Sequence, residues 1–242
     1  MKFSILTLFP EFFDALRNYS IVGRAIEESK IEINTVNIRD FSENKHGQID
    51  DYSYGGGPGM VMMAPPIYRA IKSVESENSK VIYLSPQGKT LTQKKLIELS
   101  KIEHLVLLNG HYEGIDNRII ENYVDEEISI GDYVLTGAEI PSMVLIDGIT
   151  RLLPGVLSSD ESYSIESHYN GILEYPQYTR PSSFNGYDVP EILLSGNHEK
   201  IKQYRIYEAI KVTLKKRPEL LDRDKLSDYE KKILNDIEFE GR

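Results

Sequence analysis

The sequence contains no cysteine and no tryptophan among its 242 residues. Without cysteine there can be no disulfide framework, no thiolate-ligated zinc or iron–sulfur cluster, and no thiol nucleophile. No apolar stretch approaches the ~20 residues that a transmembrane helix needs. Pro10 and Glu11 end the opening apolar run before the core of a signal peptide could form, and no small-residue cleavage site follows. We therefore expect a cytoplasmic protein that does not cross a membrane.

Basic residues are fewer than acidic ones: the chain has 28 Lys and Arg and 38 Asp and Glu, which gives a net charge of −10. Such an acidic total argues mildly against a surface coated for nucleic acid. The charges are segregated, however. Residues 200–217 carry seven basic side chains against Glu208, whereas residues 113–139 carry eight acidic side chains against Arg118. The basic stretch fits either a solvated helix face or a surface that contacts RNA.

The first half of the chain alternates short apolar runs with helical periods, in a composition (40% hydrophobic, 27% charged) that can bury a core. The expected strands cover residues 2–8, 31–38, 80–84 and 104–108, and the expected helices cover 10–16, 92–100 and 140–149. This alternation predicts an α/β fold with a parallel sheet. Because ligands bind beyond the carboxyl ends of such strands, the loops after Leu84 and Leu108 are the candidate binding loops.

The second half begins with a stretch rich in serine and acidic residues and without apolar periodicity, which is typical of a linker. After it, Asn197 can cap a helix whose apolar side contains Ile201, Tyr204, Tyr207, Ile210 and Leu214. Lys202, Arg205 and Lys216 fall on roughly the opposite side of that helix, and a further helix covers residues 227–237. We predict two domains, over 1–157 and 173–242, joined by an interdomain linker over 158–172.

Glycine is concentrated in segments 54–60, 84–88, 109–116 and 128–141. The first holds four glycines in five positions, which indicates positive φ angles or a close approach by another group. It is neither a Walker loop, since no Gly-Lys-Ser/Thr follows, nor a dinucleotide fingerprint, since Met60 replaces the third glycine. Singly, each segment could be a plain turn. The last three together predict a site for a small, nucleotide-like molecule, with Ile130 and Leu135 as apolar walls.

Other catalytic signatures are missing. The five histidines show no metal-ligand spacing, and no Gly-x-Ser-x-Gly elbow is present. Arg151, after the apolar helix expected over 140–149, fits a solvated helix end as well as a partner for an oxyanion.

Segments 54–60, 110–116, 129–141 and 194–198 closely resemble the tRNA (guanine-N1)-methyltransferases of the TrmD type, in the SPOUT class. The resemblance covers essentially the whole chain, including residues 3–13 and 217–221. It implies transfer of a methyl group from S-adenosylmethionine to N1 of the guanine at tRNA position 37, just 3′ of the anticodon. It also implies an α/β domain with a deep trefoil knot, an exception to the rule against knots, and a homodimer with active sites at the subunit interface.

The resemblance also assigns site residues. The cofactor pocket would use Leu84, Ser85, Pro86, Gly110, Tyr112, Glu113, Gly114, Ile130, Gly131, Tyr133, Leu135, Gly137 and Pro141. Residues 158–172 correspond to the mobile lid of the family, and the helical C-terminal domain to its tRNA-binding domain, which favours RNA contact by Lys202, Arg205 and Lys216. Family members are associated with Mg²⁺, which Glu113 with Glu166 could hold, although no ligand spacing in the sequence demonstrates a metal site.

The expected reaction requires two functional groups beside the guanine, a base and a cation. Guanine N1 carries a proton at neutral pH, so a base must remove it, and the negative charge that spreads to O6 favours a nearby cation. In the family a lid aspartate is the base and an arginine, here Arg151, steadies the oxygen. Glu166 stands at the aspartate position and is one methylene longer, with Asp160 and Glu161 as alternative bases.

The sequence departs from the family pattern at three further positions. His111 and Tyr52 stand where arginine is usual, and Ala138 replaces a glycine, so the RNA contacts of those two arginines are not expected here. Because Glu166 replaces the aspartate of the family, a second hypothesis is a nucleotide- or RNA-binding module that keeps the pocket without efficient catalysis.

Overall fold

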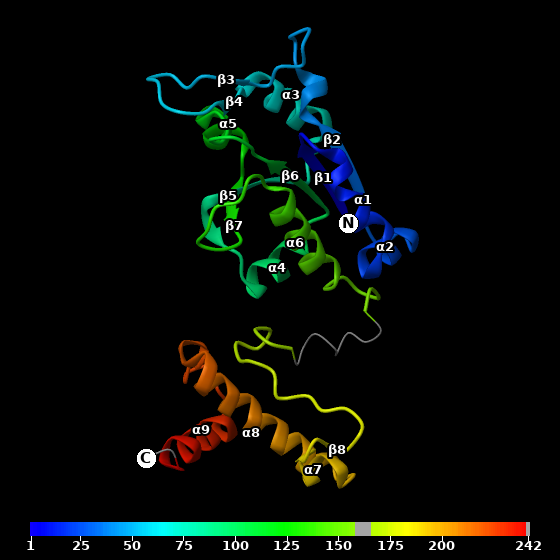
Figure 1. The fold of residues 1–242 in the computed structure, drawn as a ribbon, viewed down its shortest axis with the longest axis vertical. Coiled ribbons are helices and arrows are strands. Elements are labelled where there is room, and N and C mark those ends of the chain that lie inside the picture. The colour runs from blue at the N-terminus through cyan, green and yellow to red at the C-terminus, as the bar shows by residue number, and fades with distance from the viewer. Residues whose placement is uncertain (158–165, 241–242) are drawn as a thin grey trace. The chain divides into compact units, whose positions relative to one another are not determined.

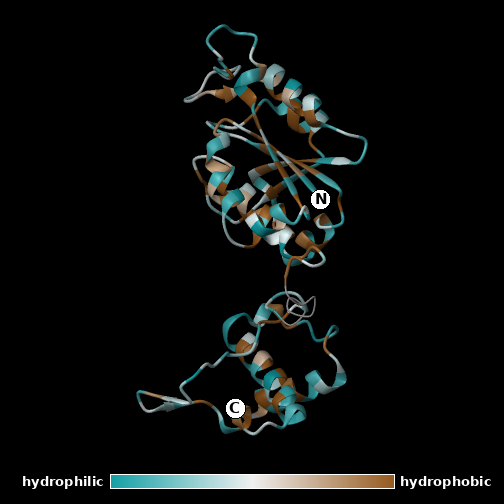
Figure 2. Ribbon diagram, turned by 90° about the vertical axis from the view of Figure 1, so that its right-hand side faces the viewer, coloured by the Kyte–Doolittle hydropathy of each residue, from teal (hydrophilic) through white to brown (hydrophobic). Residues whose placement is uncertain are grey.

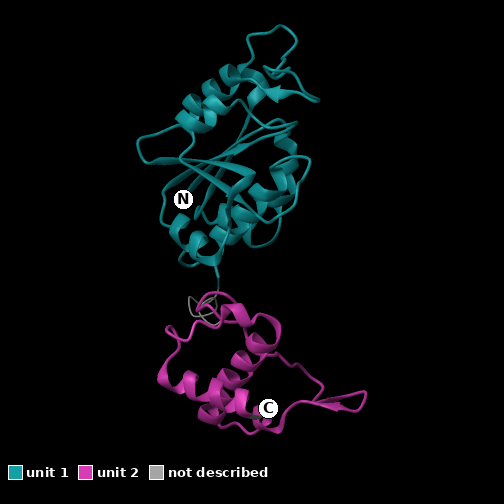
Figure 3. Cartoon of the chain, turned by 90° about the vertical axis from the view of Figure 1, so that its left-hand side faces the viewer, with its two compact units in different colours: residues 1–159 teal, residues 160–242 magenta. Residues whose placement is uncertain are grey.

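The computed structural model describes residues 1–157 and 166–240. The chain divides into two compact units, Met1–Ser159 and Asp160–Arg242, shown in different colours in Figure 3. This division falls within the linker predicted over 158–172, whose residues 158–165 lie outside the described part of the chain.

The first unit is built on a five-stranded sheet in the order β2-β1-β6-β5-β7, and every neighbouring pair in it is parallel. Its strands are β1 (Lys2–Thr7), β2 (Glu32–Asn37), β5 (Ser79–Thr90), β6 (His104–Asn109) and β7 (Glu126–Ser129). The predicted α/β class with a parallel sheet is therefore confirmed. Helices cover both faces of this sheet (Figure 1), as parallel sheets require.

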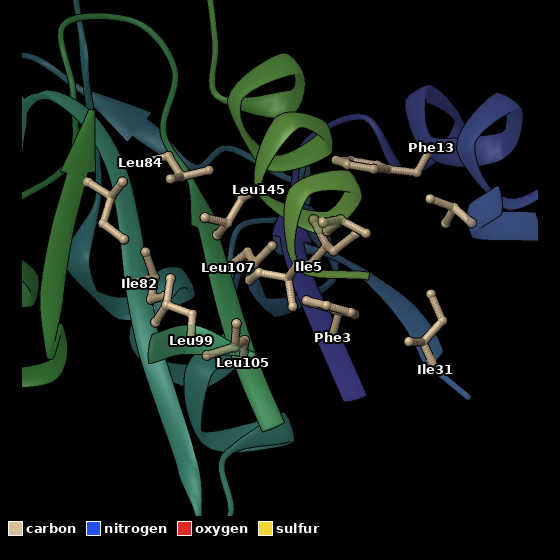
Figure 4. Packing of buried hydrophobic residues seen from close by; sticks show 14 of the residues in the cluster. Phe3, Ile5, Phe13, Ile31, Ile82, Leu84, Leu99, Leu105, Leu107 and Leu145 are labelled. Atoms are coloured by element: carbon tan, nitrogen blue, oxygen red, sulfur yellow. The ribbon is translucent and has the colours of Figure 1, made fainter. Parts of the chain in front are cut away.

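Alternate side chains of the central strands enter two separate cores. On one face, Phe3, Ile5 and Leu107 belong to a cluster with residues of three helices, α2 (Ser20–Glu27), α4 (Gln93–Leu99) and α6 (Glu139–Thr150) (Figure 4). On the other face, Leu6 and Leu108 belong to a cluster with residues of α3 (Ala64–Val74) and α5 (Asn117–Tyr123). Because both faces are covered, apolar residues predominate in the middle of the central strands, which is brown in Figure 2, although Ser4 and Thr7 of β1 are buried as well.

The helical elements of the first unit connect the strands. They are η1 (Pro10–Phe13), α1 (Asp14–Asn18), α2 (Ser20–Glu27), η2 (Ile38–Phe41), α3 (Ala64–Val74), α4 (Gln93–Leu99), α5 (Asn117–Tyr123) and α6 (Glu139–Thr150). The predicted start of α4 is confirmed, because the Thr92 side chain accepts a hydrogen bond from the Lys95 amide. A short antiparallel pair, β3 (Asp50–Asp51) with β4 (Val61–Met62), flanks the first glycine cluster.

Two strands at one edge of the sheet differ from the sequence-based expectation. β5 continues beyond the predicted end at Leu84, and its register against β7 shifts so that Leu84 and Lys89 both pair with Ile128. The residues between them are thus displaced from the regular ladder and form a wall beside the end of β7. β7 is a strand that the apolar pattern does not predict, because Ile128 is its one apolar residue.

Ion pairs attach β7 to its neighbours. Glu126 lies 2.6 Å from Lys80 Nζ on β5 and 2.8 Å from Lys95 Nζ on α4. Burial opposes ionisation of Glu126, but hydrogen bonds from both lysines outweigh it and lower the pKa of the carboxyl.

The second unit contains a hairpin, β8 (Ser183–Phe184) with β9 (Tyr187–Asp188), and the elements α7 (Glu191–Leu194), α8 (His198–Lys216), η3 (Pro218–Leu220) and α9 (Asp228–Glu240). As predicted, the Asn197 side chain caps α8 by accepting a hydrogen bond from the Lys200 amide. Ile210 on α8 packs in a small core with Leu226, Ile233 and Leu234. Within residues 1–157 and 166–240, none of the helices has the length and apolar character that a membrane crossing requires.

Candidate active site

The first unit holds a cavity of about 330 Å³ where β6 and β7 end and where the register of β5 shifts. Its walls come from residues 83–87, from the loop after β6 and from the long loop between β7 and α6. All thirteen residues predicted to bind the cofactor line this one cavity. The structure therefore brings together loops that are far apart in the sequence.

The wall chemistry combines apolar side chains with loop backbone. Ile130, Val134 and Leu135 contribute apolar surface, and the glycines at 110, 114, 131 and 137 line the cavity without side chains. The described lining includes no lysine or arginine, and Glu113 is its one carboxylate. Such a site suits a ligand with an apolar ring and a positively charged group.

The first glycine cluster lies against this cavity through Glu113. Its four glycines all have positive φ angles, as the sequence predicted. A Cβ added at Gly59 would lie 2.4 Å from the Glu113 side chain, and the Glu113 amide donates to the Met60 carbonyl at 3.1 Å. The cluster therefore approaches a pocket residue closely, which a side chain at Gly59 would prevent.

A buried polar network lies beneath the pocket loops. His111 Nε2 lies 2.9 Å from both carboxylate oxygens of Glu139, which is 5% exposed at the start of α6. The Thr7 hydroxyl, at the end of β1, donates to the same carboxylate at 2.7 Å. The His111 ring also meets the edge of Phe9, with ring centroids 5.0 Å apart. These contacts tie the loop after β6 to α6 and β1.

The close approach of two pocket loops depends on Gly137. Its backbone forms an isolated bridge with His111, and an added Cβ would lie 2.2 Å from His111 Cε1 and 2.7 Å from Glu139 Oε2. The position is thus too tight for any side chain while His111 keeps its place.

Two ionisable groups near the cavity have shifted pKa values. Burial, with a smaller contribution from the charge of Glu127, raises the pKa of the Tyr83 phenol to about 12, so this side chain stays protonated at neutral pH. The Arg118 side chain donates hydrogen bonds to Asp116, the N-cap of α5, and holds the pKa of that carboxyl below its usual value. Neither group is a proton acceptor of the kind that the predicted chemistry needs.

The two residues predicted to act on the substrate belong to different units. Arg151 is the C-cap of α6 in the first unit, where its amide donates to the Asp147 carbonyl. Glu166 belongs to the second unit, where its carbonyl accepts a hydrogen bond from the Tyr169 amide. Asp160 and Glu161, the alternative bases, lie outside the described residues.

The predicted RNA-binding side chains Lys202, Arg205 and Lys216 are all exposed on α8. Lys202 and Arg205 line a groove of about 540 Å³ in the second unit, and Glu166 lines the same groove. The structure thus places the predicted base near two of the predicted RNA-binding residues. The described residues contain no group of three His, Asp or Glu side chains that could hold a metal ion.

Sequence reasoning missed the roles of Thr7, His111 and Glu139 beneath the pocket. His111 drew attention only because arginine is usual there. The signal that could have found the network is Glu139, an acidic residue that opens an otherwise apolar helix. A carboxylate in such a place requires buried partners.

Comparison with known proteins points to one family. Residues 1–223 match the family model described as tRNA (guanine-1)-methyltransferase TrmD. A tRNA (guanine-N(1)-)-methyltransferase from Ruminiclostridium cellulolyticum is 58% identical over 226 residues, covering 92% of this chain and 97% of the relative. One from Finegoldia magna is 56% identical, covering 91% and 94%. One from Caldanaerobacter subterraneus subsp. tengcongensis is 53% identical, covering 99% and 100%.

Proposed function

The chain belongs to the TrmD family of tRNA (guanine-1)-methyltransferases, and on that premise we propose that it methylates N1 of the guanine at tRNA position 37. S-Adenosylmethionine supplies the methyl group as an electrophile attached to a sulfonium. The observation that carries the proposal is the cavity beside β5, β6 and β7, because all thirteen residues expected around the cofactor line it. Because its substrate is tRNA, we expect the enzyme to act in the cytoplasm.

The cavity fits this cosubstrate in three respects. Its volume of about 330 Å³ falls within the range of small-molecule sites, ~300–1,000 Å³. Ile130 and Leu135 offer apolar surface to an adenine ring, and the loop backbone offers hydrogen bonds to its edges. The absence of lysine and arginine from the described lining avoids repulsion of a sulfonium, and Glu113 supplies an opposite charge.

Residues of the chain then prepare the guanine. Glu166 takes the N1 proton, which makes the lone pair of N1 available for the methyl group. The Arg151 guanidinium stabilises the negative charge that develops on O6. Lys202, Arg205 and Lys216 hold the tRNA backbone on the exposed face of α8. Glu113 and Glu166 are the two carboxylates that would hold Mg²⁺ if the enzyme uses it.

The proposal includes the trefoil knot and the homodimer that the family implies. A dimer interface beside the pocket is supported by exposed apolar side chains on the loop before α6 and on α6 itself. These side chains are Val134, Leu135, Ile140 and Val144. Apolar side chains gathered on one surface are typical of contact with a partner, and a partner there would border the cofactor cavity.

Calorimetry combined with a transfer assay separates the enzyme from the second hypothesis, a binding module without efficient catalysis. We expect S-adenosylmethionine to bind and its methyl group to reach tRNA. Binding without transfer would favour the module. No binding of S-adenosylmethionine would contradict both hypotheses, since both depend on the cavity. The names of the relatives favour the enzyme, and no observation favours the module.

Replacing Gly137 by alanine is expected to weaken the binding of S-adenosylmethionine by about tenfold or more. The new Cβ would lie 2.2 Å from His111 Cε1, so the two pocket loops would have to move apart. Titration calorimetry measures the change. Gly47→Ala is the control, because Gly47 lies outside the lining of the cavity and an added Cβ there would meet no atom within 4 Å. Unchanged affinity in Gly137→Ala would contradict this account of the pocket.

A further inference from the structure

The second unit contains another cavity, of about 390 Å³, whose described lining shares one residue, Arg205, with those assigned in the proposed function. It lies between residues 175–182 and α8, with the hairpin and α7 at its rim, and all of its lining residues belong to the described part of the second unit. Leu193 and Ile201 contribute apolar surface, while Tyr175, Tyr178, Arg180 and Arg205 contribute aromatic rings and guanidinium groups. Its lining therefore combines stacking surfaces with positive charge.

The charge of this cavity opposes that of the chain. Arg180 and Arg205 both line it, and its described lining contains no carboxylate, although the chain as a whole has a net charge of −10. Among the described residues, neither arginine forms an ion pair with a carboxylate. Two guanidinium groups without a protein counter-ion are suited to bind an anion such as a phosphate.

Two tyrosine rings belong to the wall of this cavity. The Arg205 guanidinium lies over the Tyr175 ring, 4.8 Å from its centroid. Tyr178 is 48% exposed. An exposed aromatic ring in a cavity wall offers a face on which a planar base can stack.

The hairpin extends these properties beyond the cavity. Ser182 and Val189 line the cavity and are joined by a hydrogen bond of 2.8 Å at the base of the hairpin. Between them, Phe184 and Tyr187 are 66% and 81% exposed. The hairpin projects from the second unit in Figure 3, so it adds two exposed aromatic rings next to the positively charged cavity.

We propose that this cavity binds an unpaired nucleotide of the substrate RNA, with the base stacked on Tyr178 and the phosphate held by Arg180 and Arg205. Aromatic rings interleaved with arginines are the chemistry by which proteins bind single-stranded nucleic acid. The inference rests on the proposed function for the identity of the RNA, and it adds a specific nucleotide site to the exposed face of α8. The site recognises an extruded loop nucleotide in addition to the target guanine.

The test uses the full chain and a short RNA hairpin that carries the fluorescent base 2-aminopurine in its loop. Tyr178→Ala should raise the Kd for this RNA by about tenfold or more, as loss of one base–aromatic stack does. Tyr178→Phe keeps the ring and should bind almost as wild type does. Tyr229→Ala is the matched control, because Tyr229 is 46% exposed on α9, outside the cavity.

The phosphate contact has its own test. Arg180→Gln should reduce the slope of log K against log salt concentration by roughly 0.7, the value for one contact to a single strand. Lys232→Gln is the control for net charge, since Lys232 is exposed on α9 outside the cavity. Because Arg180 is exposed, its replacement keeps the proposal testable even if Tyr178→Ala fails to fold.

Three results would overturn the nucleotide site. The 2-aminopurine fluorescence would not change when the RNA binds, or the RNA affinity would be unaffected by Tyr178→Ala and Arg180→Gln. The third is a loss of RNA affinity in the controls Tyr229→Ala and Lys232→Gln that equals the loss in these variants. Methyl transfer by the wild type distinguishes the two proposals. If the wild type methylates tRNA and both variants bind RNA normally, only the nucleotide site fails. If both variants weaken RNA binding and the wild type transfers no methyl group, only the proposed function fails.

Discussion

Replacement of Glu166 by glutamine is expected to lower kcat for methyl transfer by about 10²- to 10⁴-fold, the usual contribution of a general base. Glutamine has nearly the same shape, but its amide cannot accept the N1 proton of guanine. The groove that Glu166 shares with Lys202 and Arg205 keeps its basic residues, so tRNA affinity should change little. Single-turnover transfer from labelled S-adenosylmethionine measures the rate apart from binding.

Two further variants test whether the loss of activity is specific to the carboxylate of Glu166. Glu174→Gln is a matched control, because Glu174 lines the same groove and is not assigned to catalysis. Glu166→Asp shortens the side chain by one methylene and should retain part of the activity, since the carboxylate remains. Undiminished transfer by Glu166→Gln would remove Glu166 from the mechanism and leave Asp160 or Glu161 as the base.

Replacement of Arg151 by alanine is expected to lower kcat by about 10²- to 10³-fold, as loss of an oxyanion donor does in other enzymes. Arg151 follows α6 and does not line the cofactor cavity, so the affinity for S-adenosylmethionine should stay within about twofold of the wild type. The expected signature is thus a loss of turnover without a loss of cofactor binding, measured by transfer kinetics and calorimetry on the same preparations.

Arg151→Lys should fall between the wild type and Arg151→Ala, because lysine keeps the charge but not the planar pair of donors. Arg39→Ala removes an exposed arginine of the first unit and serves as the control for net charge. A normal kcat in Arg151→Ala would exclude the arginine from the reaction. An equal loss in cofactor affinity and in kcat would instead assign it to the pocket.

Much of the first unit could be predicted because local patterns agree with the final packing. β1 and β6 are apolar runs whose alternate residues fill two cores, and Thr92 marks the start of α4 by a cap that is visible in the sequence. β5 was predicted too short, because Pro86 and Gly88 usually end a strand. In this protein both residues lie between Leu84 and Lys89, where the pairing of β5 with β7 is interrupted, so neither of them replaces a regularly paired residue.

The candidate site was predictable for a similar reason. Its loops follow strands of one parallel sheet, whose carboxyl ends lie together whatever the separation in sequence. An acid at the start of α6 signals that Glu139 has buried partners, but their identity, Thr7 and His111, could not be predicted, because a contact over 132 residues leaves no periodicity. The relation of Arg151 to Glu166 was likewise inaccessible to pattern analysis, since their shared role came from the family resemblance alone.

The central claim is tested most directly by methyl transfer from labelled S-adenosylmethionine to two tRNA transcripts that differ only at position 37. One transcript carries guanine there and the other carries adenine. We predict that the full chain methylates the guanine transcript, that the product is the N1-methylated base, and that the adenine transcript stays unlabelled. Equal labelling of both transcripts, or no labelling of either while S-adenosylmethionine binds, would contradict the account.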